Sequence, residues 1–216
     1  MSNRTDFADY IVQWAEKDPQ RIDLGTEEMY AYEIKDGKNT HTSFTDDVRL
    51  KDQSFTLINQ EPPLVVTHIC VDGGLIEYGK EDYVGDGIRR GRNDCILITD
   101  DQLLFIELKT DSTTEQDKRI WQNFNEGAKQ IKDFYIVFRD FLAEQGRPLS
   151  GFFPLLNSNV HAFVCIDPYP KLTKGPGKIP MTNRQNELEA FRVETGGLKV
   201  YPLTSYKVGS EVSWLS

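Results

Sequence analysis

Residues 93–110 read NDCILITDDQLLFIELKT. Two apolar runs flank Asp100 and Asp101, which predicts two β-strands joined by a two-residue turn. That turn pairs Thr99 with Gln102, and this pairing sets which residues oppose one another along the whole hairpin. Both faces of the hairpin are apolar at its centre, which is typical of a strand pair buried on both sides in a layered domain.

Three charged side chains are expected on one face of this hairpin. Asp94 lies directly opposite Glu107 in the predicted register, and opposed residues of an antiparallel pair have Cβ atoms ~4.5–5.5 Å apart. Lys109 follows two residues after Glu107 and therefore points to the same face. Two carboxylates this close repel each other unless they share a cation. The trio suits metal-assisted hydrolysis, with Asp94 and Glu107 as ligands of Mg²⁺ or Mn²⁺ and Lys109 near the attacking water.

The sequence on either side of the hairpin predicts one α/β (α+β) domain over residues 1–216, with a mixed central sheet flanked by helices. Its core spans 64–166, and the acidic segment 1–61 is expected to be a helical elaboration. The expected elements are helices over 4–17, around 27–34 and over 112–145, a hairpin over 64–79, and strands over 159–166 and, at a sheet edge, 198–203. Residues 168–186, rich in Pro, Gly and Lys, are expected to form a loop.

Composition limits the classes of function. The chain has 216 residues with 34 acidic and 25 basic side chains, a formal net charge of −9. This excludes a generally basic nucleic-acid coat protein but not a local basic groove. The start of the chain lacks the apolar core of a signal peptide, and the three cysteines have no zinc-binding spacing, so we expect a cytoplasmic protein with buried, reduced thiols and no membrane partner.

The spacing of the charged trio resembles a known family. Asp94, twelve further residues and then Glu107-Leu108-Lys109 are similar to the PD-(D/E)xK signature of restriction-endonuclease-like nucleases. The resemblance covers residues 64–166. It departs from the family at Asn93, where many relatives have Pro, and on the next helix, where Gln130 is followed at the fourth position by Phe rather than Tyr.

The resemblance implies a divalent-metal-dependent nuclease, with Asp94, Glu107 and Lys109 as catalytic residues and DNA as the expected substrate. Restriction, repair and bacterial defence enzymes share this core, and the fold does not choose among them. Many relatives also use an upstream acid as a metal ligand. Glu77, on the preceding hairpin, is the candidate for this role, and Glu27 and Glu28 are alternatives.

Basic residues near the trio predict how an acidic protein would hold a polyanion. The candidates for nucleic-acid contacts are Arg89, Arg90, Arg92, Lys118, Arg119 and, from the long helix, Gln130. With the 168–186 loop they would form one basic stripe around the carboxylates, and the acidic residues 1–61 would lie on the far side. Surface solubility is the alternative explanation for these arginines and lysines.

Other interpretations of the same residues stay open. The trio could be a cross-strand salt bridge in a non-catalytic, nuclease-like binding module, whose acidic first third docks a basic protein partner. Glycoside hydrolysis by the two carboxylates is less favoured, because it leaves Lys109 without a role. His68 and His161 lie in apolar strands and are expected to be core residues. A homodimer would match the two-fold symmetry of duplex DNA, but no interface is marked in the sequence.

Overall fold

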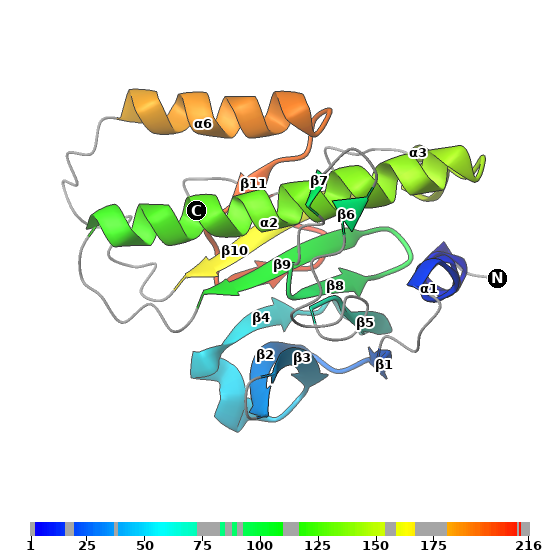
Figure 1. Cartoon of the computed structure of the whole chain (residues 1–216). Helices are drawn as coiled ribbons and strands as arrows, with labels where there is room; N and C mark the ends of the chain where they lie inside the picture. Colours follow the sequence, from blue (N-terminus) through cyan, green and yellow to red (C-terminus); the bar gives the residue numbers. More distant parts are fainter. Residues whose placement is uncertain are drawn as a thin grey trace.

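In the computed structural model, the hairpin lies in the middle of a six-stranded sheet (Figure 1). The strands, in spatial order, are β1 (Ile22–Leu24), β5 (Val66–Cys70), β8 (Cys95–Ile98), β9 (Leu103–Lys109), β10 (Val160–Ile166) and β11 (Val200–Tyr201). The first four strands are antiparallel to one another, whereas β10 runs parallel to both β9 and β11. The mixed sheet and its accompanying helices agree with the predicted α+β class.

A second sheet covers one face of the first. Its strands, in spatial order, are β12 (Ser205–Lys207), β4 (Ser54–Ile58), β2 (Glu28–Asp36) and β3 (Asn39–Thr45), and the 3-10 helix η1 (Val48–Gln53) precedes β4. Apolar side chains from both sheets pack together between them, including Met29 and Phe55 from the second sheet and Leu97 and Leu104 from the hairpin. This packing accounts for one of the two apolar faces of the hairpin.

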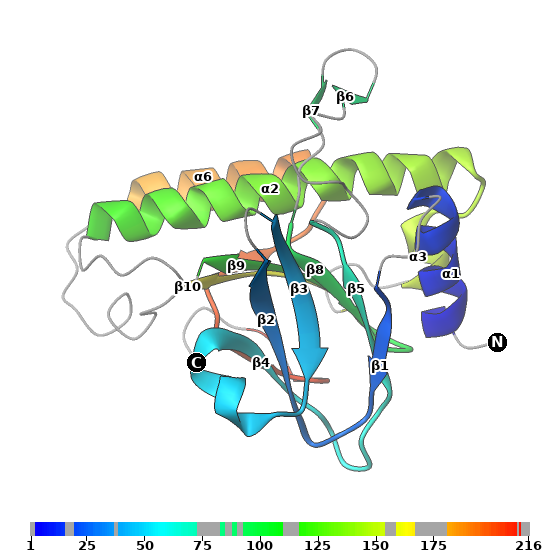
Figure 2. The ribbon, with the colours of Figure 1, turned by 60° about the horizontal axis from the view of Figure 1, so that its bottom comes forward.

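Helices cover the opposite face of the six-stranded sheet. They are α1 (Asn3–Ala15), α2 (Asp117–Glu144), α3 (Leu149–Phe152) and α6 (Met181–Glu194). Ile96 and Phe105 of the hairpin pack there against Phe7 of α1 and Phe134 of α2. Figures 1 and 2 show the resulting three layers, with the helices on one side of the central sheet and β2, β3 and β4 on the other. The hairpin is therefore buried on both faces, as predicted.

The long helix α2 confirms the spacing seen in the sequence. The predicted apolar positions between Trp121 and Leu142 all contribute to the core beneath the helix. Gly146 then ends it with a φ of +70°, a conformation that favours glycine. The N–H groups of Gly146 and Arg147 donate to the carbonyls of Ala143 and Leu142, at 3.0 and 2.9 Å.

The helix expected around residues 27–34 is wrong, because this segment forms β2. Met29 and Ala31 point toward the other sheet, and alternate residues point away, which is the two-residue period of a strand. Pairing with both β3 and β4 outweighs the local helix preference of this polar sequence. Of the residues that the structure describes within 1–61, only α1 and the short η1 are helical, so the expected helical elaboration is largely a β-sheet.

The loop expected over 168–186 is wrong in its last part. Residues 181–186 begin α6. The strands expected at 64–71, 159–166 and 198–203 are confirmed as β5, β10 and β11, and β11 lies at the sheet edge as predicted.

The structure describes residues 3–15, 20–36, 39–72, 83–84, 88–89, 93–109, 117–153, 159–166, 181–210 and 212. The partner strand predicted at 75–79 and residues 168–180 lie outside these ranges. A two-stranded pair, β6 (Tyr83–Val84) with β7 (Ile88–Arg89), precedes the central hairpin. Within the described ranges, none of the helices has the length and apolar character needed to cross a membrane.

Candidate active site

The hairpin has the register that the two-residue turn predicts. Cys95 opposes Ile106 and Ile98 opposes Leu103. At the turn, the N–H of Thr99 donates to the carbonyl of Gln102 at 2.9 Å. Extending this register by one residue beyond the start of β8 puts Asp94 across from Glu107, at the open end of the hairpin.

Asp94, Glu107 and Lys109 meet on the helical side of the sheet. Only 1% of the Glu107 surface and 7% of the Asp94 surface are exposed. The Lys109 ammonium lies 2.6 Å from Glu107 Oε1 and donates to the side-chain carbonyl of Gln130 at 2.8 Å. Gln130 comes from α2, so the predicted polar residue of the long helix does reach the trio, where it holds the lysine.

Asp94 is anchored through both its side chain and its backbone. Its carboxylate accepts a short hydrogen bond from the N–H of Leu108, the residue between Glu107 and Lys109. Its carbonyl accepts from the N–H of Val71 at 2.9 Å and from the Thr42 hydroxyl at 3.0 Å. These bonds connect Asp94 to the three neighbouring segments β9, β5 and β3, so its position is fixed from several directions.

Both carboxyl groups are held in surroundings that oppose their charge. Burial raises the pKa of Glu107 to about 7, although the adjacent Lys109 works in the opposite direction. Burial and then the charge of Glu107 raise the pKa of Asp94 well above its ordinary value. Burial alone would lower the pKa of Lys109, but its carboxylate neighbours outweigh this and raise it. A lysine that stays charged therefore faces two carboxyl groups that favour protonation or a second cation.

The arrangement fits a divalent cation with hard oxygen ligands. Glu107 Oε2 is buried and has no hydrogen-bond partner within the part of the chain that the structure describes. It lies beside a second buried carboxylate, so a cation would satisfy the free oxygen and offset the repulsion. No group of three or more His, Cys, Asp or Glu side chains in the described ranges is arranged to hold a metal. Asp94 and Glu107 would thus be two protein ligands, which is common for Mg²⁺.

Gly127 lets α2 approach this site closely. A Cβ atom at Gly127 would lie 2.8 Å from Val164 Cγ1 and 3.0 Å from Glu107 Cγ, closer than packed atoms approach. The helix backbone therefore lies almost directly on the Glu107 side chain. Glycine at this position keeps Glu107 buried, because α2 packs on it without an intervening side chain.

Two acidic residues near the site were missed in the sequence. The charge of Asp72 raises the pKa of Glu107, and the charge of Glu33 raises that of Asp94. Asp72 follows the apolar run of β5, and its N–H approaches the Asp94 carbonyl at 3.4 Å. The signal for Asp72 in the sequence was therefore an acidic residue directly after the apolar run of a buried strand. No sequence signal pointed to Glu33, because it lies in the strand that was predicted as a helix.

The predicted third carboxylate is not located among the described residues. Glu77 lies outside them. Glu28 accepts hydrogen bonds from the Tyr30 hydroxyl at 2.7 Å and from Lys51 at 3.1 Å, at the far end of β2 from Glu33. Glu27 is exposed near the same end of that strand.

Most of the predicted nucleic-acid contacts cannot be placed relative to the trio. Arg90 and Arg92 lie outside the described residues. The backbone of Arg89 belongs to β7, and the backbones of Lys118 and Arg119 belong to the first turn of α2, but their side chains lie outside the described part. The basic stripe therefore stays a prediction.

The remaining candidates are structural. His68 is buried, and burial lowers its pKa to about 3, so it is neutral. His161 packs among Phe163, Tyr201 and Tyr206. Cys70, Cys95 and Cys165 are buried thiols that form no disulfide bond, as predicted.

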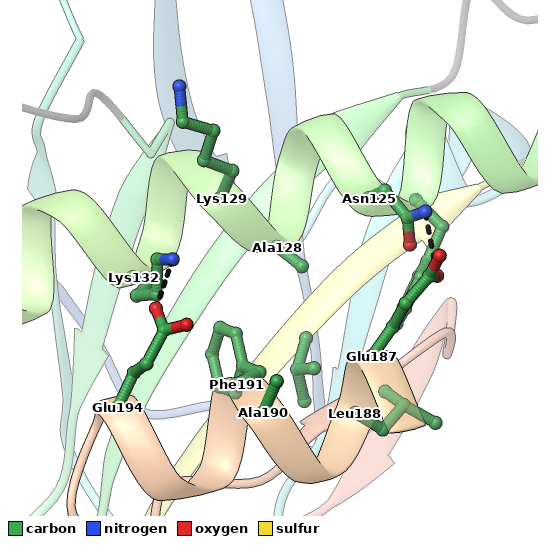
Figure 3. A pocket seen from close by; sticks show the side chains of 11 residues that line it. Asn125, Ala128, Lys129, Lys132, Glu187, Leu188, Ala190, Phe191 and Glu194 are labelled. Atoms are coloured by element: carbon green, nitrogen blue, oxygen red, sulfur yellow. Dashed lines mark hydrogen bonds and ion pairs between the residues drawn. The ribbon is translucent and has the colours of Figure 1, made fainter. Parts of the chain in front are cut away.

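A separate groove lies between α2 and α6 and does not contain the trio (Figure 3). Its volume is about 300 Å³. Asn125 donates to Glu187 at 2.9 Å, and two helical turns further along Lys132 pairs with Glu194. Residues such as Ala128 and Phe191 line the apolar space between these polar contacts. The helix α2 thus separates the groove from the carboxylates.

No protein-family model, curated protein or solved structure matches this chain. The chemical interpretation of the site therefore depends on its own geometry.

Proposed function

We propose that the protein is a divalent-metal-dependent nuclease that hydrolyses phosphodiester bonds, with DNA as the expected substrate. The observation that carries this proposal is the meeting of two buried carboxylates and a charged lysine at the open end of the hairpin. Among the described residues, the positive charge beside the carboxylates does not offset their burial, because the pKa of both is raised, and one oxygen of Glu107 has no hydrogen-bond partner. Such a site is costly to keep unless it serves a ligand.

Each residue of the trio has a role in this chemistry. Asp94 and Glu107 would hold Mg²⁺ or Mn²⁺, which when bound polarises a phosphoryl oxygen and lowers the pKa of a bound water. Lys109 remains charged and would orient the attacking water and offset the negative charge that develops on phosphorus. Gln130 fixes the ammonium of Lys109 through their 2.8 Å hydrogen bond.

The order of the elements supports the same proposal. A helix precedes three antiparallel strands, β5, β8 and β9, and then α2 leads to β10, which is parallel to β9. The acid opens the second of these strands and Glu107-Leu108-Lys109 ends the third. This is the placement that the resemblance to the PD-(D/E)xK nucleases implies, and the second sheet built from residues 28–58 and 205–207 would be an addition to that core.

The test is cleavage of plasmid, single-stranded DNA and RNA in Mg²⁺ and in Mn²⁺. We expect Glu107→Gln and Lys109→Met to lower the rate at least about 10²-fold, because each removes a group that acts on the reacting atoms. Glu194→Gln and Lys132→Met are matched controls, since they alter an ion pair of the same kind on the far side of α2. Cleavage that persists in both site variants would refute the proposal.

A non-catalytic binding module is the second candidate, and one observation favours it. The Lys109 ammonium already lies 2.6 Å from Glu107, so part of the buried charge is neutralised within the protein. If calorimetry detects no binding of Mg²⁺ or Mn²⁺, and neither ion raises the melting temperature, this alternative is supported. A basic protein partner for residues 1–61 would then be the next ligand to test.

A further inference from the structure

Asn93, the residue before Asp94, joins the two strands of the hairpin at their open end. Its side chain is completely buried. The Nδ2 group donates to the carbonyl of Cys95 at 2.7 Å and to that of Ile106 at 3.4 Å. Both partners are carbonyl oxygens, which only accept hydrogen bonds, so this orientation of the amide is the one that satisfies them. One side chain therefore bridges β8 and β9.

The contacts of Asn93 and Asp94 lie on either side of Glu107. The Asn93 amide reaches the carbonyl of residue 106, and the Asp94 carboxylate accepts from the N–H of residue 108. Asp94 itself lies before the first residue of β8, outside the paired part of the hairpin. These side-chain bonds hold the segment that carries Asp94 against the segment that carries Glu107.

We propose that Asn93 is a positioning residue, whose buried amide fixes the Asp94 and Glu107 carboxylates relative to each other. The identification of these carboxylates as a metal site depends on the proposed function. The positioning itself is a property of the folded chain and can be measured without metal or substrate.

The chain contains a matched control at the other end of the same hairpin. The Nδ2 group of Asn159 donates to the carbonyl of Asp101, in the turn, at 2.6 Å. Asn159→Ala removes a hydrogen bond from an amide group to a backbone carbonyl of the same hairpin, but far from the carboxylates. A general loosening of the hairpin would speed exchange at Leu108 in variants of either asparagine, whereas a positioning role affects Leu108 only when Asn93 is changed.

The experiment compares Asn93→Ala, Asn93→Leu and Asn159→Ala by amide hydrogen exchange of the metal-free protein. Asn93→Leu nearly keeps the buried volume, so it tests the amide even if the alanine variant fails to fold. We expect the Leu108 amide to exchange at least about tenfold faster in the Asn93 variants, relative to Leu104 at the centre of the hairpin. Asn159→Ala should leave that ratio unchanged.

Calorimetry with Mn²⁺ completes the test. We expect the folded Asn93 variants to bind Mn²⁺ about tenfold more weakly than the unsubstituted protein, and Asn159→Ala to bind it equally well. If the wild-type chain binds no Mn²⁺ while Leu108 still responds selectively, the metal proposal fails and the positioning role stands. If Leu108 does not respond, or responds equally to Asn159→Ala, the positioning role is refuted.

Discussion

Burial opposes the negative charge of the Glu107 carboxylate. The stability of the metal-free protein should therefore depend on pH in a predictable way. The pKa of Glu107 is raised in the folded state to about 7 from an ordinary 4.5. A carboxyl with a raised pKa contributes stability that is present below pH 4.5 and is lost as the pH rises through 7. Between pH 5 and pH 8 this loss is about 2 kcal/mol. Denaturant unfolding in a chelator should show it.

Glu107→Gln should remove the part of the pH dependence that comes from Glu107, because glutamine does not titrate, and leave the part that comes from Asp94, whose pKa burial also raises. The control is Glu194→Gln, an exposed acid that pairs with Lys132 and should leave the profile unchanged. Stability profiles that are parallel for the wild-type protein and Glu107→Gln would contradict the buried, charge-opposing environment described for this residue.

At the scale of the elements, α2 lies close to both β9 and β10 at Gly127. Gly127→Ala would normally stabilise a helix by up to about 1 kcal/mol. Here the added methyl group would lie within 3.0 Å of both Val164 and Glu107. We therefore expect the free energy of unfolding to fall by about 1–2 kcal/mol and metal binding to weaken. Thermal unfolding and calorimetry measure both effects. Gly151→Ala in α3, which has open space around it, should be close to neutral.

The elements also show what could be predicted from sequence. The β8–β9 register was predictable because the two-residue turn at Asp100 and Asp101 sets the pairing of every residue that follows along the hairpin. From that register followed the meeting of Asp94, Glu107 and Lys109. The strand β2 was not predictable in the same way, because its burial depends on β4 and β3 as neighbours. With β2 assigned to a helix, the approach of Glu33 to Asp94 could not be foreseen.

At the scale of the whole molecule, the unpredicted feature is the layer formed by the second sheet. The strand β12 pairs in parallel with β4, and Ser205 lies opposite Thr56. No local pattern encodes a pairing between segments so far apart in the chain. The apolar second face of the hairpin did indicate that some layer must cover it. The identity of that layer required the structure.

The acidic character of the whole chain sets the final prediction, because a protein with a net charge of −9 must segregate its charge to hold a polyanion. Around the trio, Glu33 and Asp72 add further negative charge. The predicted contacts with phosphates therefore depend on basic residues such as Arg89 and Arg90, which precede the hairpin in the sequence. We expect binding of DNA in a chelator to weaken steeply with salt, and the double variant Arg89→Ala with Arg90→Ala to lower the slope of log K against log salt by about 2.

The control for this measurement is Arg49→Ala with Lys51→Ala. These two residues lie on η1 and pair with Asp47, which precedes η1, and with Glu28 of β2 in the second sheet. If that sheet faces away from the nucleic acid, their loss leaves the salt slope unchanged, although the net charge changes by the same amount as in the Arg89 and Arg90 variant. A slope that falls equally in both double variants would mean that overall charge, and not a basic stripe beside the carboxylates, governs binding. An unchanged slope in the Arg89 and Arg90 variant would instead favour a protein partner, because these two arginines would then make no phosphate contact.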